Sequence, residues 1–131
     1  MPTKFLIDRF NKNSNLNALI WKDQSCSYGW LYKEIKNVDK LFKEYGVSPG
    51  SVVLLEGDYS PKGVSLFLAL IQNNCIVVPL TSSLDNNTKK YFIKISQPEF
   101  IISISSKDKV SVKKTKDTDK TFNNLYNLLR E

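Results

Sequence analysis

The sequence predicts an α/β fold, in which an N-terminal helix, a β-hairpin and a long helix precede a βαβαβ half of a doubly wound parallel sheet. Three continuous apolar runs bounded by turn residues carry this prediction, at residues 52–55, 75–78 and 100–104. Such runs are typical of strands covered on both faces of a parallel sheet. Segments with helical periodicity separate them, and right-handed crossovers are expected. Because 131 residues suffice for one hydrophobic core, we expect a single domain, 1–131.

The first 51 residues are expected to form a helix, a hairpin and a second, longer helix. Residues 3–13 place apolar side chains at helical spacing, and residues 18–21 and 25–28 flank a polar break typical of a hairpin. Ser27 is the expected N-cap of the long helix, and Gly46 ends it. One apolar stripe runs along this helix: Leu31, Ile35, Val38, Phe42 and Tyr45. Pro49 and Gly50 then predict a type II turn.

Residues 52–106 are expected to form the βαβαβ unit. Ser60 and Pro61 open its first helix as N-cap and first residue, and Pro79 is expected to end the second strand. Asp85 or Asn86 caps the next helix, which Pro98 breaks. The side chains expected to face the sheet are Val64, Phe67, Leu68 and Ile71 on the first helix and Tyr91, Phe92 and Ile95 on the second.

Residues 107–131 comprise a lysine-rich segment and a terminal helix. The segment contributes +3 of the formal net charge of +6 through Lys107, Lys109, Lys113, Lys114, Lys116 and Lys120 against three aspartates. It has no aromatic residue until Phe122, so its pattern favours a solvated loop or edge strand over a nucleic-acid interface. Thr118 or Asp119 is the expected cap of a helix with Phe122, Leu125, Tyr126 and Leu129 on one face.

Composition excludes several kinds of chemistry. The chain has no histidine, so it cannot itself build a Ser-His-Asp or Cys-His nucleophile or a histidine-containing zinc site. Cys26 and Cys75 stand apart in apolar surroundings and are interpreted as small core residues. No signal peptide or disulfide framework is evident, which favours the cytoplasm. Polar residues interrupt the longest apolar stretch, 64–80, so no membrane span is expected.

The most suggestive place for a ligand is the loop from Gly57 to Gly63, which joins a strand to a helix. Open α/β sheets bind ligands at such loops, but no phosphate-binding glycine motif occurs, and an ordinary connection is favoured. Glu56 and Asp58 are the only carboxylates in a suggestive position. Glu34, Asp39 and Glu44 are interpreted as solvated helix charges, and Trp21, Tyr28 and Trp30 as packing residues. The residues themselves therefore assign no catalytic, cofactor-binding or metal-binding side chain, and leave any substrate-binding residue unknown.

Five short motifs in order give the sequence a family resemblance. They are Asn17-Ala18-Leu19-Ile20, Ser27-Tyr28-Gly29-Trp30-Leu31, the segment 45–55 (YGVSPGSVVLL), Phe67-Leu68-Ala69-Leu70 and Ile76-Val77-Val78-Pro79-Leu80. Together they resemble the opening of the AMP-forming adenylating enzymes, which include acyl-CoA synthetases, adenylation domains and luciferases. The chain departs from that pattern at Trp30, where the family often has Glu, at Ser51, where Asp is frequent, and at Asn74-Cys75, where Gly-Ala is usual.

The resemblance implies a parent ligase that uses ATP and Mg²⁺ to convert a carboxylate to an acyl-adenylate, then passes the acyl group to CoA or a carrier protein. The phosphate loop, the adenine and ribose motifs and the catalytic lysine of that family do not occur in these 131 residues. We therefore expect an N-terminal piece that binds no cofactor and is not catalytic alone. It should self-associate through the open edge of its third strand and through uncovered apolar faces. The alternative is a stand-alone binding domain that uses residues 107–120.

Overall fold

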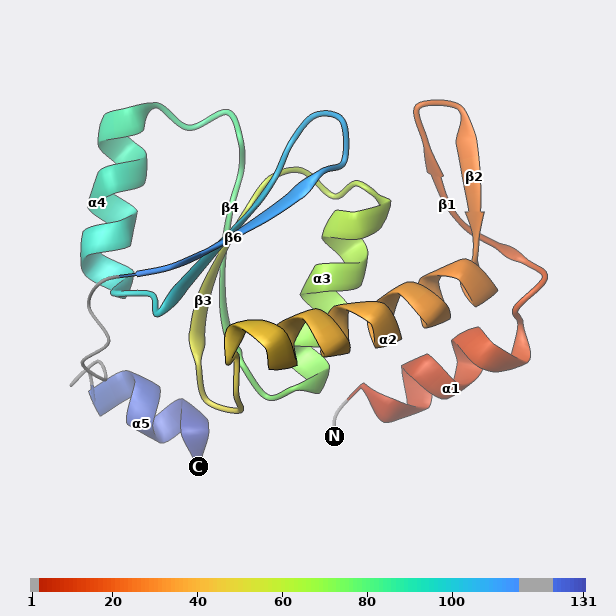
Figure 1. Ribbon diagram of the computed structural model, residues 1–131, viewed down its shortest axis with the longest axis horizontal. Coiled ribbons are helices and arrows are strands. Elements are labelled where there is room, and N and C mark those ends of the chain that lie inside the picture. The colour runs from red at the N-terminus through yellow and green to blue at the C-terminus, as the bar shows by residue number, and fades with distance from the viewer. Residues whose placement is uncertain (1–2, 116–123) are drawn as a thin grey trace.

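The computed structural model describes residues 3–115 and 124–131. Its elements alternate between helices and strands, which confirms the predicted α/β class (Figure 1). In chain order they are α1 (Lys4–Lys12), β1 (Asn17–Trp21), β2 (Gln24–Ser27), α2 (Tyr28–Tyr45), β3 (Val52–Glu56), α3 (Pro61–Gln72), β4 (Ile76–Leu80), α4 (Asn86–Ser96), β5 (Phe100–Ile104), β6 (Val110–Lys114) and α5 (Asn124–Arg130).

The main sheet has the strand order β4-β3-β5-β6. Strand β3 pairs in parallel with both β4 and β5, which confirms the βαβαβ unit, and β6 adds an antiparallel edge. The first four residues of β3 are buried because helices lie on both sides of the sheet, with α2 and α3 on one side and α4 on the other (Figure 1). The separate hairpin pairs β1 with β2.

Local capping chemistry sets the ends of α2 as the sequence predicts. The backbone N–H of Trp30 donates to Ser27 Oγ at 3.0 Å, and Gly46 ends the helix in the left-handed conformation with a φ of 79°. Gly50 has a φ of 85° and the N–H of Ser51 donates to the carbonyl of Ser48, as a type II turn requires.

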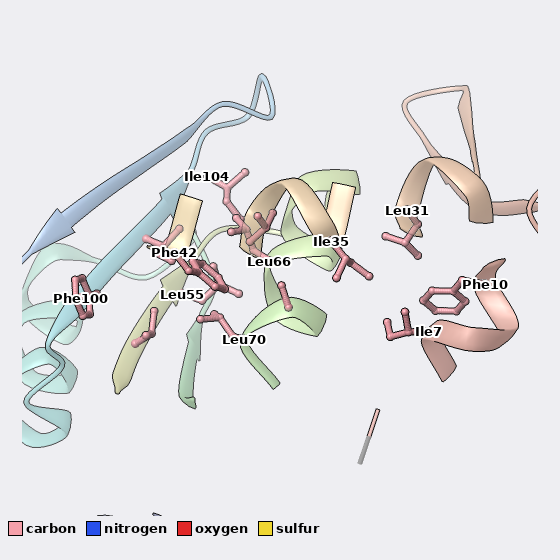
Figure 2. Packing of buried hydrophobic residues seen from close by; sticks show 14 residues of the cluster. Ile7, Phe10, Leu31, Ile35, Phe42, Leu55, Leu66, Leu70, Phe100 and Ile104 are labelled. Atoms are coloured by element: carbon pink, nitrogen blue, oxygen red, sulfur yellow. The ribbon is translucent and has the colours of Figure 1, made fainter. Parts of the chain in front are cut away.

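The main core lies between the sheet and the helices α2 and α3, and α1 extends it along α2 (Figure 2). Leu31, Ile35, Val38 and Phe42 of α2 are buried as predicted, whereas Tyr45 is exposed. The predicted inner face of α3 is wrong in part. Its buried side chains include Leu66, Ala69 and Leu70, whereas the predicted Val64, Phe67 and Leu68 are half-buried and pack against the core, and Ile71 is half-buried. The reason is that α2 packs along α3, so the buried stripe faces both α2 and the sheet.

Pro79 does not end β4, as the sequence led us to expect, but lies inside it opposite Leu55. The N–H of Ile76 donates to the Ser51 carbonyl and the Leu80 carbonyl accepts from Gly57 N–H, so alternate residues of β4 face β3. The nitrogen of Pro79 therefore points to the outer edge, where no ladder hydrogen bond is lost. Because β4 is an edge strand, its apolar residues are half-buried rather than covered on both faces.

Helix α4 begins as predicted but presents its apolar side chains differently. Asp85 is the N-cap, with its carboxylate accepting from Thr88 N–H at 2.7 Å, and this bond lowers the pKa of Asp85. Tyr91, Phe92 and Ile95, predicted to face inward, are 61%, 38% and 54% exposed. The sheet covers too little of α4 to bury them, so the helix leaves an apolar face open within the described part of the chain.

The C-terminal segment partly matches its prediction. Residues 110–114 form the edge strand β6, one of the two predicted alternatives, and β6 covers the edge of β5 that we expected to be open. Tyr126 of α5 is buried and its hydroxyl donates to the Ser96 carbonyl, but Leu129 is exposed because α5 touches the domain through Tyr126 and Arg130. The predicted Phe122, Thr118 and Asp119 lie outside the described residues.

Candidate functional site

The carboxyl ends of β3 and β5 bring together Glu56, Lys89 and Ser103. Glu56 forms an ion pair with Lys89 of α4 at 2.5 Å and accepts a hydrogen bond from Ser103 Oγ at 3.2 Å. Sequence reasoning identified Glu56 but not its partners, since they lie on other elements. The pair links α4 to the end of β3, and it leaves this carboxylate engaged within the protein.

Asp58, the other acidic residue that the sequence singled out, is exposed and stands apart from Glu56. Its carboxylate accepts a hydrogen bond from Ser82 Oγ at 3.2 Å, in the loop after β4. The structure therefore gives the two carboxylates separate partners, and it offers no evidence that they share one proton or one ligand.

The N-terminus of α3 is the part of this edge best suited to hold an anion, because backbone N–H groups converge there. The chain fills the position itself. Asp108, in the turn between β5 and β6, accepts hydrogen bonds from Ser60 Oγ and from the N–H of Lys62, while Ser60 Oγ accepts from Gly63 N–H. Sequence reasoning missed Asp108, whose contacts lie 46 and 48 residues away and leave no local signal.

Gly57 and Gly63 serve close packing rather than phosphate binding. A Cβ on Gly57 would lie 3.0 Å from the carbonyl oxygen and Cβ of Ile104, and the φ of 145° at Gly57 disfavours any other residue. A Cβ on Gly63 would meet the carbonyl oxygen of Asp58 at 2.5 Å. Both observations support the favoured interpretation of an ordinary strand-to-helix connection.

A small cavity lies beside this loop, between the ends of β3, β4 and β5. Its volume is about 160 Å³ and its walls include Leu55, Asp58, Tyr59, Pro79, Thr81 and Ile104. Sites for drug-sized ligands usually measure about 300–1,000 Å³. The cavity is therefore too small for a nucleotide.

The cysteines lie closer to the surface than the sequence suggests, since both are half-buried rather than in the core, and both are free thiols. Burial, with a smaller contribution from the charge of Glu99, raises the pKa of Cys75 to about 11. A thiol with such a pKa is protonated at neutral pH, so Cys75 is a poor nucleophile.

Other candidates from the sequence have structural roles. Tyr28 and Trp30 pack against the core as expected, whereas Trp21 is half-buried outside that cluster, with Lys22 Nζ 4.4 Å from its ring centroid. Glu44 is exposed as predicted, but Glu34 and Asp39 are half-buried, and Asp39 links α2 to α3 by accepting from Asn73 Nδ2 at 2.7 Å.

Residues 3–115 and 124–131 contain no group of three acidic or cysteine side chains placed to hold a metal ion. None of the helices described there is long and apolar enough to cross a membrane.

One family model matches most of this chain. The family model described as AMP-binding enzyme matches residues 7–127. Bacitracin synthase 3 of Bacillus licheniformis is 24% identical over 96 residues, which are 73% of this chain and 2% of that protein. The chain therefore spans a very small part of that relative.

Solved structures show where this fold occurs. The N-terminal subdomain of Klebsiella oxytoca NpsA matches with a TM-score of 0.69 and 18% identity, over 76% of this chain and 26% of that one. VinN, solved in complex with L-aspartate, matches with a TM-score of 0.72 and 16% identity, over 79% of this chain and 30% of that one. At these identities the matches establish the fold.

Proposed function

This chain belongs to the family of AMP-binding enzymes, and on that premise we propose that it forms the N-terminal part of an ATP-dependent ligase that activates a carboxylate as an acyl-adenylate. The observation that carries the proposal is the family match over residues 7–127, joined to a fold shared with about a quarter of the length of the NpsA N-terminal subdomain. In the proposed reaction AMP is attached to the carboxylate and pyrophosphate leaves. The acyl group then passes to a thiol of CoA or of a carrier protein, in the cytoplasm.

The described residues do not themselves fit ATP or Mg²⁺. The helix N-terminus at the sheet edge already holds the carboxylate of Asp108, and the neighbouring cavity of about 160 Å³ is too small for a nucleotide. No three carboxylates converge among these residues. We therefore assign no step of the reaction to this part of the protein, and we propose that it serves as scaffold.

The exposed apolar face of α4 is the surface through which this scaffold would contact the rest of the ligase. Helix α4 lies on the side of the sheet opposite α2 and α3 (Figure 1), and its Tyr91, Phe92 and Ile95 remain exposed among the described residues. We propose that the remainder of the ligase packs here. The matched structures are three to four times longer than the stretch they share with this chain, which leaves ample polypeptide to do so.

Pyrophosphate exchange into ATP tests the proposal. Residues 1–131 alone should give no carboxylate-dependent exchange, whereas the longest polypeptide encoded by the gene should give exchange with a member of a carboxylate panel. Exchange by residues 1–131 would overturn the scaffold role. Absence of exchange by the full polypeptide with every carboxylate, despite correct folding, would instead overturn the assignment as a ligase.

A further inference from the structure

The two outer edges of the main sheet differ in their capacity to accept another strand. At β4 one of the two outward positions is taken by Pro79, which has no N–H to donate. At β6, the hydrogen bonds on either side of the strand show which of its residues bond to β5. Thr115 N–H donates to the Glu99 carbonyl, and Ser105 N–H donates to the Lys109 carbonyl. Hydrogen-bonded pairs alternate in an antiparallel ladder, so Ser111 and Lys113 bond to β5.

It follows that the N–H and C=O groups of Val110, Val112 and Lys114 point away from β5. Among the described residues no strand lies on that side of β6. Three donors and three acceptors at regular spacing form a template for an added strand. No proline interrupts β6, in contrast to β4.

A groove runs beside this edge, between β6 and one face of α2. Its volume is about 670 Å³, within the range of ligand sites, and it is lined by Val38, Leu41 and Tyr45 of α2 and by Val110 and Val112. Alternate residues of a strand point to the same face. Every second side chain of a strand added to β6 would therefore enter this groove, which is lined by both apolar and charged side chains.

The charge around the edge indicates the kind of segment that it accepts. Lys62 and Lys109 line the groove, where Glu34 is the one acidic lining residue, and the exposed Lys113 and Lys114 end the strand. A basic or neutral segment would leave the positive charge of these lysines uncompensated. An acidic segment would be complementary to it.

We propose that β6 and its groove bind an extended acidic segment of a partner protein, which joins the sheet as a fifth strand. On the groove face of the segment, apolar side chains contact Val110 and Val112, and carboxylates lie near Lys62, Lys109 and Lys114. This surface lies on the other side of the sheet from α4, and the proposal does not depend on ligase activity.

Binding of defined peptides to residues 1–131 tests the proposal directly. The probe is a fluorescent eight-residue peptide, Val-Val-Glu-Glu repeated twice, measured by fluorescence anisotropy; as a strand it presents alternating valine and glutamate on each face. The controls are the same peptide with lysine for glutamate and the same peptide N-methylated at alternate residues. We expect the acidic peptide to bind at least tenfold more tightly than either control, because the first control reverses the charge and the second cannot form the ladder.

Two sets of variants locate the binding. Val112→Pro removes an outward N–H while sparing the bonds of β6 to β5, and it should weaken peptide binding at least tenfold. The double variant Lys62→Gln and Lys109→Gln leaves the strand unaltered and should weaken binding several-fold. Should Val112→Pro fail to fold, hydrogen exchange on the unmutated chain serves instead: the acidic peptide should slow exchange at Val110, Val112 and Lys114, with little change at Ser111 and Lys113.

Three results would overturn the proposal. One is equal binding of the N-methylated and unmodified acidic peptides. Another is unaltered exchange at the outward amides when the peptide is bound. The third is self-association that Val112→Pro abolishes, which would identify a second copy of the chain as the occupant of the edge.

Discussion

At the scale of single residues, the environment of Cys75 makes a prediction about reactivity. Burial, and to a smaller degree the charge of Glu99, raises the pKa of this thiol from 9.0 to about 11, so about a hundredfold less thiolate is present at neutral pH. In a Cys26→Ser background, where Cys75 is the single cysteine, alkylation by iodoacetamide should therefore rise with pH well beyond pH 9. Mass spectrometry of timed samples gives the rate at each pH.

The substitution Glu99→Gln separates the two causes of the raised pKa of Cys75, which are burial and the charge of Glu99. The substitution removes the carboxylate charge and leaves the thiol buried, so the pH profile should move towards lower pH and still lie above that of an exposed thiol. A profile centred near pH 9 in the Cys26→Ser background would show that Cys75 is not buried as described.

At the scale of elements, α3 depends on a residue far along the chain. Asp108 has a left-handed φ of 60° and bonds to Ser60 Oγ and to the N–H of Lys62. Asp108→Ala should destabilise the protein by about 1–3 kcal/mol, because it removes charged hydrogen bonds from a helix N-terminus. Asp108→Asn keeps a residue that tolerates this φ and removes only the charge, so its cost should be about 0.5–1 kcal/mol. Urea unfolding measures both values.

Asp58→Asn is the matched control for Asp108, since Asp58 is an exposed acid on the neighbouring loop with one side-chain hydrogen bond. Its effect should stay within about 0.5 kcal/mol. Equal stability of Asp108→Ala and the unmutated chain would contradict the capping role of Asp108.

The boundaries of the elements could be predicted from sequence because their causes are local. Ser27, Gly46, Ser60 and Asp85 act on backbone groups within four residues, so the sequence alone places both ends of α2 and the starts of α3 and α4. The buried face of α3 could not be predicted, since it depends on α2 packing along that helix. The same limit applies to the candidate site. Glu56 could be identified from the sequence because it ends a predicted strand. Lys89 and Asp108 could not, because only the folded chain brings them to their partners Glu56 and Lys62.

At the scale of the whole molecule, only one of the two causes of self-association that the sequence suggested is ruled out, the open edge of the third strand. The edge of β5 is covered by β6, and β4 presents Pro79 at its own edge, so neither explains association. The exposed apolar face of α4 remains, with the rings of Tyr91 and Phe92 6.0 Å apart. Exposed contiguous apolar surface is typical of an interface.

We therefore predict that residues 1–131 self-associate through α4, and that the double variant Tyr91→Gln and Ile95→Gln raises the dissociation constant at least tenfold in sedimentation velocity. Both side chains are more than half exposed, so the substitutions should leave the fold intact. Phe5→Gln and Ile20→Gln, at side chains 68% and 76% exposed on other elements, remove comparable apolar surface as controls. If the controls weaken association as much as the α4 variant, association is non-specific. If the α4 variant alone becomes monomeric, α4 is identified as the surface through which this domain packs against other polypeptide, as the proposed place in a larger ligase requires.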